Sequence, residues 1–185
     1  MLKRLLASSV FVIAAATLCA QTAAPKAPPK SPTETASVTI AGKTVSITYS
    51  SPRVNGREGK IFTKDGLIGH DKTYPVWRAG ANAATKFHTD GDLMIENLVV
   101  PKGDYTLYVD VSNPDSWQLV INKQTGQWGT VYDKAQDLGR VPFPTNASPS
   151  LVENLTYTLK DLGGNRASLN LSWEDKSATV AFSVK

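Results

Sequence analysis

Apolar and polar residues alternate along most of the chain from position 36 onward. Residues 38–40 and 45–49 alternate on either side of Ala41-Gly42, which predicts a hairpin. The other candidate strands are 93–95, 98–100, 105–111, 117–122, 127–132, 151–159, 167–173 and 178–184. Turns about every ten residues, with little helical periodicity, are typical of an all-β fold. We therefore expect a single antiparallel β-sandwich, jelly-roll-like or immunoglobulin-like.

Gly, Pro, Asn and Asp mark the ends of these strands. The expected turns are 101–104, 113–116, 123–126, 163–165 and 174–177. Such residues favour turns because Gly adopts positive φ and Asn and Asp bond to nearby backbone. A single helical turn is expected at 134–138. Asp110 alternates with apolar neighbours, so we expect it on a solvated face of its strand.

Residues 50–88 break the alternation. The segment is rich in Gly and polar residues, and it holds both histidines, His70 and His88. Long irregular segments in compact domains are usually functional or disordered, and the Trp, Ile, Phe and Leu embedded here argue against disorder. We expect any site to lie in this segment.

The N-terminus predicts export. A basic start and an apolar run over 5–18 are typical of a secretory signal peptide, which we assign to 1–20 with cleavage before Gln21. Cys19 raises the alternative of a lipid anchor, but Leu18 is large for the position before a lipidated cysteine. The run is shorter than the roughly 20 apolar residues that span a bilayer. A periplasmic or secreted protein is therefore expected.

A Pro-rich spacer follows the signal. Residues 21–35 contain four prolines and no large apolar side chain, which is typical of a disordered linker. Residues 36–185 then form one β-sandwich domain, large enough for one core. Removal of the signal removes Cys19, the only cysteine, so the domain has no disulfide. No second apolar run of transmembrane length follows.

Positive charge is concentrated in the irregular segment. Residues 50–88 hold seven basic and three acidic residues, whereas residues 89–185 hold eight basic and twelve acidic ones. A basic patch attracts anionic ligands, nucleic acid or membrane surfaces. Because an exported protein rarely meets nucleic acid and no RNA-binding signature is present, we expect an anionic ligand or a glycan and no nucleic acid.

Trp77 and Arg78 have two interpretations. Arg78 offers a planar fork for a carboxylate or phosphate, with Trp77 as a face for a sugar ring or a cation. Alternatively, Trp77 fills the core and Arg78 bonds loop carbonyls, and this structural interpretation is favoured. The candidate ligand-binding residues are Arg53, Arg57, Lys60, Trp77, Arg78 and Asn82, with Arg78 as the anion contact. Core positions are expected for the remaining tryptophans, Trp117, Trp128 and Trp173.

No catalytic or metal motif stands out. Two histidines 18 positions apart do not have metal-ligand spacing, so we expect neither a metal nor a cofactor. One alternative is a hydrolase that uses His70 or His88 as general base near an aspartate. Such an enzyme requires an imidazole close to a carboxylate, in a cleft with a nucleophile. Another alternative is a structural partner-binding domain.

Several blocks of the sequence resemble a bacterial family catalogued as domain of unknown function 2911. The most specific is Pro75-Val76-Trp77-Arg78-Ala79-Gly80-Ala81-Asn82-Ala83-Ala84-Thr85. Other similar blocks are 51–53, 56–57, 60–62, 101–107, 117–123, 125–129 and 171–174. The resemblance covers roughly 38–184. It implies an exported β-rich domain and brings no assigned activity, cofactor or catalytic residue.

The sequence thus predicts an exported protein with a non-catalytic role, either ligand binding or association with the cell envelope. Its expected site is the basic loop of residues 50–88.

Overall fold

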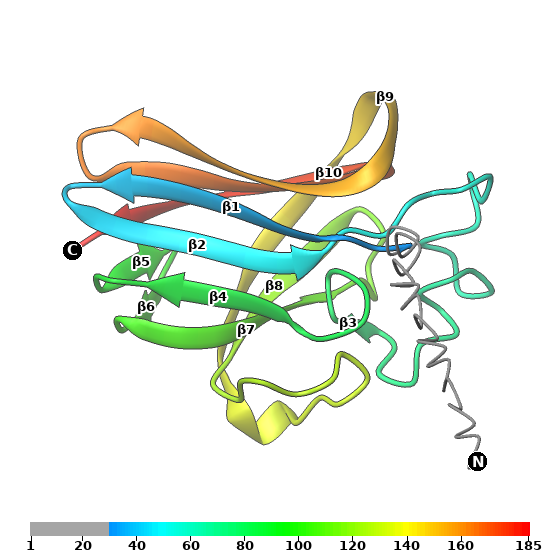
Figure 1. The fold of residues 1–185 in the computed structure, drawn as a ribbon, viewed down its shortest axis with the longest axis horizontal. Coiled ribbons are helices and arrows are strands. Elements are labelled where there is room, and N and C mark those ends of the chain that lie inside the picture. The colour runs from blue at the N-terminus through cyan, green and yellow to red at the C-terminus, as the bar shows by residue number, and fades with distance from the viewer. Residues whose placement is uncertain (1–29) are drawn as a thin grey trace, which may run out of the picture.

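A computed structural model describes residues 30–185, which form ten strands and one 3₁₀ turn (Figure 1). The elements are β1 Thr33–Ile40, β2 Lys43–Ser50, β3 Val76–Trp77, β4 Thr85–Thr89, β5 Leu93–Ile95, β6 Leu98–Val100, β7 Gly103–Asp110, β8 Ser116–Asn122, η1 Lys134–Gln136, β9 Asp137–Gly163 and β10 Arg166–Val184. The all-β class is confirmed. Within 30–185, no helix has the length and apolar character needed to cross a membrane.

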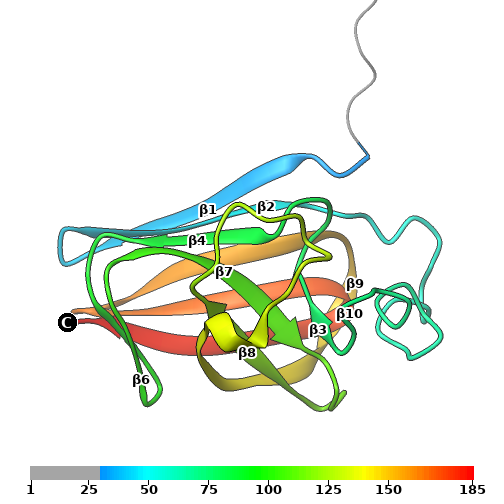
Figure 2. The same ribbon diagram turned by 90° about the horizontal axis from the view of Figure 1, so that it is seen from below.

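The strands form one antiparallel sheet in the order β1-β2-β4-β7-β8-β9-β10-β5-β6, with β3 added to β7. The sheet bends back on itself through β9, whose first part pairs with β8 and whose remainder pairs with β10. Figure 2 shows β1, β2 and β4 on one side and β9 and β10 on the other. Tyr49 of β2 and Tyr157 of β9 touch across the bend, with ring centroids 4.8 Å apart. The arrangement is sandwich-like.

The alternation of each strand explains the core between these layers. In β2, for example, Val45, Ile47 and Tyr49 are buried while their neighbours are not. The largest fully buried side chains include Trp117 and Trp173, whose core positions are confirmed. Each such large apolar side chain contributes roughly 1.5–3 kcal/mol on burial.

A smaller apolar cluster lies outside the main core. It consists of Val76, Ala84, Tyr108 and Val120, with Tyr132 packed against it. The segment between β8 and β9 supplies Tyr132. Asp110 lies on the same face of β7 as Tyr108, and it bonds to Arg140 of β9 at 2.7 Å. The expectation that Asp110 lies on a solvated strand face is therefore wrong, because its side chain is only 13% exposed and is paired with Arg140.

Several boundaries differ from the sequence predictions. The signal peptide and residues 21–29 of the linker lie outside the described residues. β1 begins at Thr33, so 33–35, assigned above to the linker, belong to the sheet. Residues 127–132 form no strand. The helical turn near 134–138 is confirmed as η1.

The expected turn at 174–177 is instead a bulge within one continuous strand, β10. Register shifts occur on both sides of Glu174, which has a φ of 56°. A bulge absorbs extra residues without ending a strand. Pairing with β9 resumes at Lys176, and this pairing keeps the chain extended where its local sequence favours a turn.

Candidate functional site

Residues 51–82, here called the cap, form an ordered lobe at the end of the sheet where β2 ends (Figure 1). Val54, Ile61 and Ile68 anchor the cap because all three are buried in the main core. Backbone bonds hold it as well: Leu67 N–H donates to the Lys60 carbonyl at 2.8 Å, and Ile68 N–H to that of Ile61 at 3.0 Å. The irregular segment is therefore a built structure.

Trp77 and Arg78 act mainly as a brace. Trp77 is buried and stacks on Trp173, with ring centroids 5.7 Å apart and planes 19° from parallel. Arg78 Nη2 donates to Asp71 Oδ2, and Nη1 donates to the Asn82 carbonyl at 3.3 Å. Since Asp71 already neutralises the guanidinium, Arg78 is a weaker anion contact than the sequence suggested.

The backbone of this motif is tightly constrained. Ala79 and Asn82 have positive φ angles of 51° and 60°. A Cβ on Gly80 would lie 2.9 Å from Thr85 Oγ1 and 3.2 Å from the Ser50 carbonyl oxygen, so only glycine fits there without a shift. The unusual composition of the motif follows from these requirements of the fold.

A cavity of about 160 Å³ lies beside this brace, and we call it the Trp cavity. It is lined by Pro52, Leu67, Ile68, Asp71, Trp77, Arg78, Gly80, Ala81, Asn82 and Trp173. The structure thus brings Trp77, Arg78 and Asn82 together, as predicted from the motif. The buried Trp173 Nε1–H has no hydrogen-bond acceptor among the described residues.

The predicted core position of Trp128 is wrong, because the residue is 56% exposed. Gly129 N–H donates to the Asn82 carbonyl at 3.0 Å, and the Ala84 N–H to that of Gln127 at 3.2 Å. A Cβ on Gly129 would lie 2.2 Å from Arg78 Cδ, so the Trp128 loop rests directly on Arg78. The flanking glycines, Gly126 and Gly129, were the available signal that Trp128 sits in a loop.

The three other predicted site residues lie elsewhere on the cap. Arg53 and Lys60 are exposed and Arg57 is half-buried. Arg57 Nη2 donates to the Arg53 carbonyl at 2.6 Å. These basic side chains do not line the Trp cavity.

A second cavity, of about 360 Å³, lies between the cap, the β7–β8 turn and the bulge of β10, and we call it the Glu174 cavity. It is lined by Gly59, Phe62, Thr63, Lys64, Tyr74, Val111, Ser112, Pro114, Glu174, Asp175 and Lys176. Glu174 is only 3% exposed and accepts a hydrogen bond from Gly59 N–H. Burial raises the pKa of Glu174, although the bond from Gly59 partly opposes this. Sequence reasoning missed this residue because it placed Glu174 in a turn.

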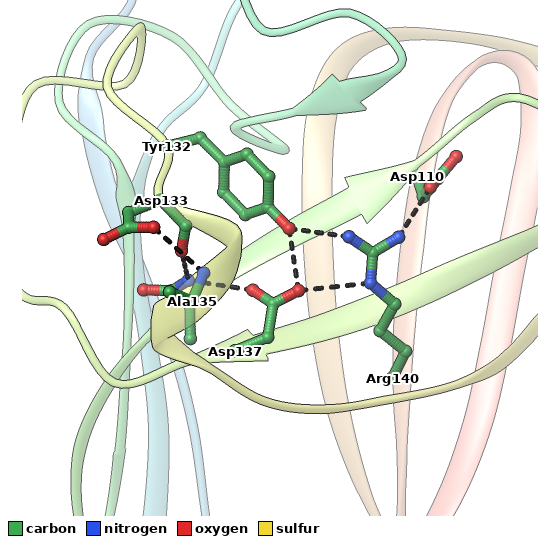
Figure 3. A network of polar contacts seen from close by, with 7 residues as sticks. Asp110, Tyr132, Asp133, Ala135, Asp137 and Arg140 are labelled. Atoms are coloured by element: carbon green, nitrogen blue, oxygen red, sulfur yellow. Dashed lines mark hydrogen bonds and ion pairs between the residues drawn. The ribbon is translucent and has the colours of Figure 1, made fainter.

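A polar network around Arg140 lies under the segment that joins β8 to β9 (Figure 3). Arg140 Nη1 donates to Asp110 at 2.7 Å, Nε to Asp137 at 3.2 Å and Nη2 to the Tyr132 hydroxyl at 2.6 Å. The Tyr132 hydroxyl in turn donates to Asp137 at 2.7 Å. Burial, together with Asp137, raises the pKa of Tyr132 to about 12. Each of the three guanidinium nitrogens donates a hydrogen bond, as in a structural brace.

The two histidines lie in different parts of the structure. His70 is exposed in the cap, and its Nδ1 lies 2.7 Å from the Gly66 carbonyl. His88 lies on β4, with Nε2 3.0 Å from Asp90 and Nδ1 2.8 Å from Asp104. These bonds, that to Asp90 foremost, raise the pKa of His88.

His88 therefore meets one requirement of a general base, contact with a carboxylate. It does not line the Trp cavity or the Glu174 cavity. Within residues 30–185, no group of three or more His, Cys, Asp or Glu side chains is arranged to hold a metal ion.

Comparison with known proteins gives a family without an assigned activity. No curated protein and no solved structure matches the chain. A family model described as protein of unknown function (DUF2911) matches residues 31–182, nearly the whole described region. The chain therefore belongs to the DUF2911 family.

Proposed function

We propose that this protein is an exported, non-catalytic module that binds a glycan beside the Trp-Arg-Ala-Gly-Ala-Asn motif. The observation that carries the proposal is the exposed ring of Trp128, whose neighbour Gly129 packs against Arg78 and Asn82, two residues that line the Trp cavity. Export is inferred from the N-terminal pattern alone.

The ring of Trp128 is 56% exposed, and backbone hydrogen bonds from Gly129 and to Gln127 hold its loop in place. The ring offers a large, rigid apolar face with one polar edge, which suits partners that combine apolar and polar surface. Sugar rings have this character, since their C–H faces are apolar and their hydroxyls both donate and accept. Asn82 beside it is exposed and offers an amide donor and acceptor.

The charge pattern favours a glycan over a simple anion. Arg78, which lies against the neighbouring Gly129, is already paired with Asp71. A paired Arg and Asp still present donors and acceptors to hydroxyl groups, whereas a small anion needs uncompensated positive charge.

Hydrogen bonds to β7 also hold the Trp128 loop in place. Gln127 Nε2 donates to the Tyr108 hydroxyl at 2.9 Å and to Thr106 Oγ1 at 3.2 Å. Tyr108 itself is fully buried, and its hydroxyl donates to the Val131 carbonyl at 2.6 Å. Such pre-organisation reduces the entropy lost on binding.

The test is calorimetric titration with peptidoglycan fragments, neutral oligosaccharides and anionic polysaccharides. Trp128→Ala should weaken binding roughly thirtyfold or more, the typical cost of removing a tryptophan at the centre of a contact. Leu151→Ala, at an equally exposed apolar residue on β9, is the matched control and should bind like the native protein. Absence of binding to every glycan, or equal binding by Trp128→Ala, would reject the proposal.

Export has its own test. A tagged full-length chain should be recovered from the periplasm or the medium, with a mature N-terminus at or within a residue or two of Gln21. Recovery of the intact chain from the cytoplasm alone would contradict this part of the proposal.

A further inference from the structure

The Glu174 cavity presents charges of both signs that the protein leaves unpaired. Lys64, Lys176, Glu174 and Asp175 all line it. The ion pairs within residues 30–185 involve Arg78, His88 and Arg140, and none involves these four residues. Two cations and two carboxyl groups thus border one hollow without neutralising one another.

Glu174 combines a strained backbone conformation with a buried carboxyl group, and both are unfavourable for folding. A non-glycine residue at a φ of 56° is strained, and such strain persists where the surrounding structure holds it in place. The residue sits in a bulge and is almost fully buried, with Gly59 N–H bonded to its Oε1. Bulges are enriched next to functional sites, where they re-aim a side chain. Here the bulge places a buried carboxyl group in the wall of the cavity.

The remaining wall is largely apolar. Phe62, Val111 and Pro114 contribute carbon surface, and the exposed side of Tyr74 adds an aromatic ring. Phe62 is fixed by edge contacts with Trp77 and Trp173, at centroid distances of 5.9 and 5.8 Å. At about 360 Å³ the cavity falls within the range of small-molecule sites, which combine apolar walls with a few polar groups.

We propose that the Glu174 cavity binds a zwitterion, an α-amino acid or short peptide with an apolar side chain. Its ammonium group bonds to Glu174, its carboxylate bonds to Lys64 and Lys176, and its side chain packs on Phe62, Val111 and Pro114. A neutral sugar would leave the buried Glu174 without a cation, and a simple anion would meet two carboxyl groups. Only a ligand with both charges complements the whole lining.

The first test uses ligands matched in shape but not in charge. L-Phenylalanine and L-leucyl-L-phenylalanine are titrated into the native protein by calorimetry, beside N-acetyl-L-phenylalanine and L-phenylalaninamide. The first analogue lacks the ammonium group and the second lacks the carboxylate. Each loses a charge-assisted hydrogen bond, so each should bind about tenfold more weakly or worse. Failure of both zwitterions to bind at millimolar concentration, or equal binding of the analogues, would overturn the proposal.

Variants test which side chains bind the ammonium group of the ligand and which bind its carboxylate. Glu174→Gln keeps an acceptor for Gly59 N–H and should weaken phenylalanine binding at least tenfold while leaving the weak binding of the N-acetyl analogue unchanged. The double variant Lys64→Ala/Lys176→Ala should weaken the binding of phenylalanine and leave the binding of L-phenylalaninamide unchanged. Lys72→Ala, an exposed lysine of the cap outside the lining, is the control. Equal binding by all variants would overturn the assignment, and thermal melts confirm that each variant folds.

The glycan proposal and the amino-acid proposal can be rejected independently of each other. Trp128→Ala should leave phenylalanine binding unchanged, because Trp128 does not line the Glu174 cavity. Competition by a neutral disaccharide for phenylalanine would show that the cavity is a sugar site and would also overturn this inference.

Discussion

The Arg140 network and the Glu174 cavity show two ways of burying charge in the same domain. Around Arg140, all three guanidinium nitrogens donate to oxygens on Asp110, Asp137 and Tyr132 (Figure 3). Around Glu174, two lysines and two carboxyl groups border a hollow without an ion pair between them. The closed network stabilises the fold, whereas the open set of charges is the one that we propose to bind a ligand.

The comparison matters because shifted pKa values occur both in the Arg140 network and at the Glu174 cavity. The pKa values of Tyr132 and Glu174 are both raised by burial. Perturbed pKa values mark functional sites and structural networks alike. The distinction comes instead from whether each polar group already has its partners, and whether space is left for a ligand.

Removal of Arg140 is the largest expected effect. Arg140→Ala leaves Asp110 and Asp137 as unpaired carboxylates, with side chains only 13% and 11% exposed. Breaking a buried pair from one side costs about 3–5 kcal/mol, and since Arg140 is itself a quarter exposed we expect about 3 kcal/mol. Urea denaturation at pH 7 measures this loss in the free energy of unfolding.

The matched variant Arg140→Lys keeps the charge but loses the planar fork, and should cost less than Arg140→Ala. Binding of phenylalanine at the Glu174 cavity should be unchanged in both variants. A loss below about 0.5 kcal/mol for Arg140→Ala would show that the network is not a brace.

The second effect concerns Tyr132 and alkaline pH. Tyr132→Phe removes the hydroxyl that bonds Asp137 and Arg140, and should cost about 1–2 kcal/mol at pH 7. The folded pKa of about 12 lies above the ordinary value of 10, so native stability falls as the pH rises from 10 through 12. The difference from Tyr132→Phe should therefore shrink in that window. Denaturation curves at pH 7 and 11 test this, and a constant difference would contradict it.

Much of the fold could be predicted because strand alternation reports which face is buried. The hairpin around Ala41-Gly42 and the strands β5 and β6 fall where the pattern placed them. The continuity of β10 could not be predicted, since the local sequence at 174–177 favours a turn and only pairing with β9 overrides it. The burial of Asp110 likewise depends on Arg140, which lies 30 positions along the chain on β9.

The candidate sites were predictable only where their residues are neighbours in sequence. Trp77, Arg78 and Asn82 share one motif, and they also share one cavity. Glu174 meets Lys64 and Tyr74 only because the cap folds onto the bulge of β10. Trp128 was misassigned because its alternation looked like a strand, although the glycines beside it form a loop that exposes the ring.

The smallest effect is a pH-dependent difference between the native protein and Glu174→Gln. Because burial raises the folded pKa of Glu174 above its ordinary value near 4.5, the folded state holds the proton more tightly than the unfolded state. Native stability therefore falls as the pH rises through that window, while the neutral glutamine is insensitive to it. Relative to the native protein, Glu174→Gln should therefore gain stability between pH 4 and pH 7. Urea denaturation of both proteins across this range measures the difference, and Asp161→Asn, at an exposed acid on β9, is the control.

A gain in stability combined with a loss of amino-acid binding would mark Glu174 as a residue kept for its ligand at the expense of the fold. A large loss of stability at every pH would instead place Glu174 with Arg140, as part of a brace.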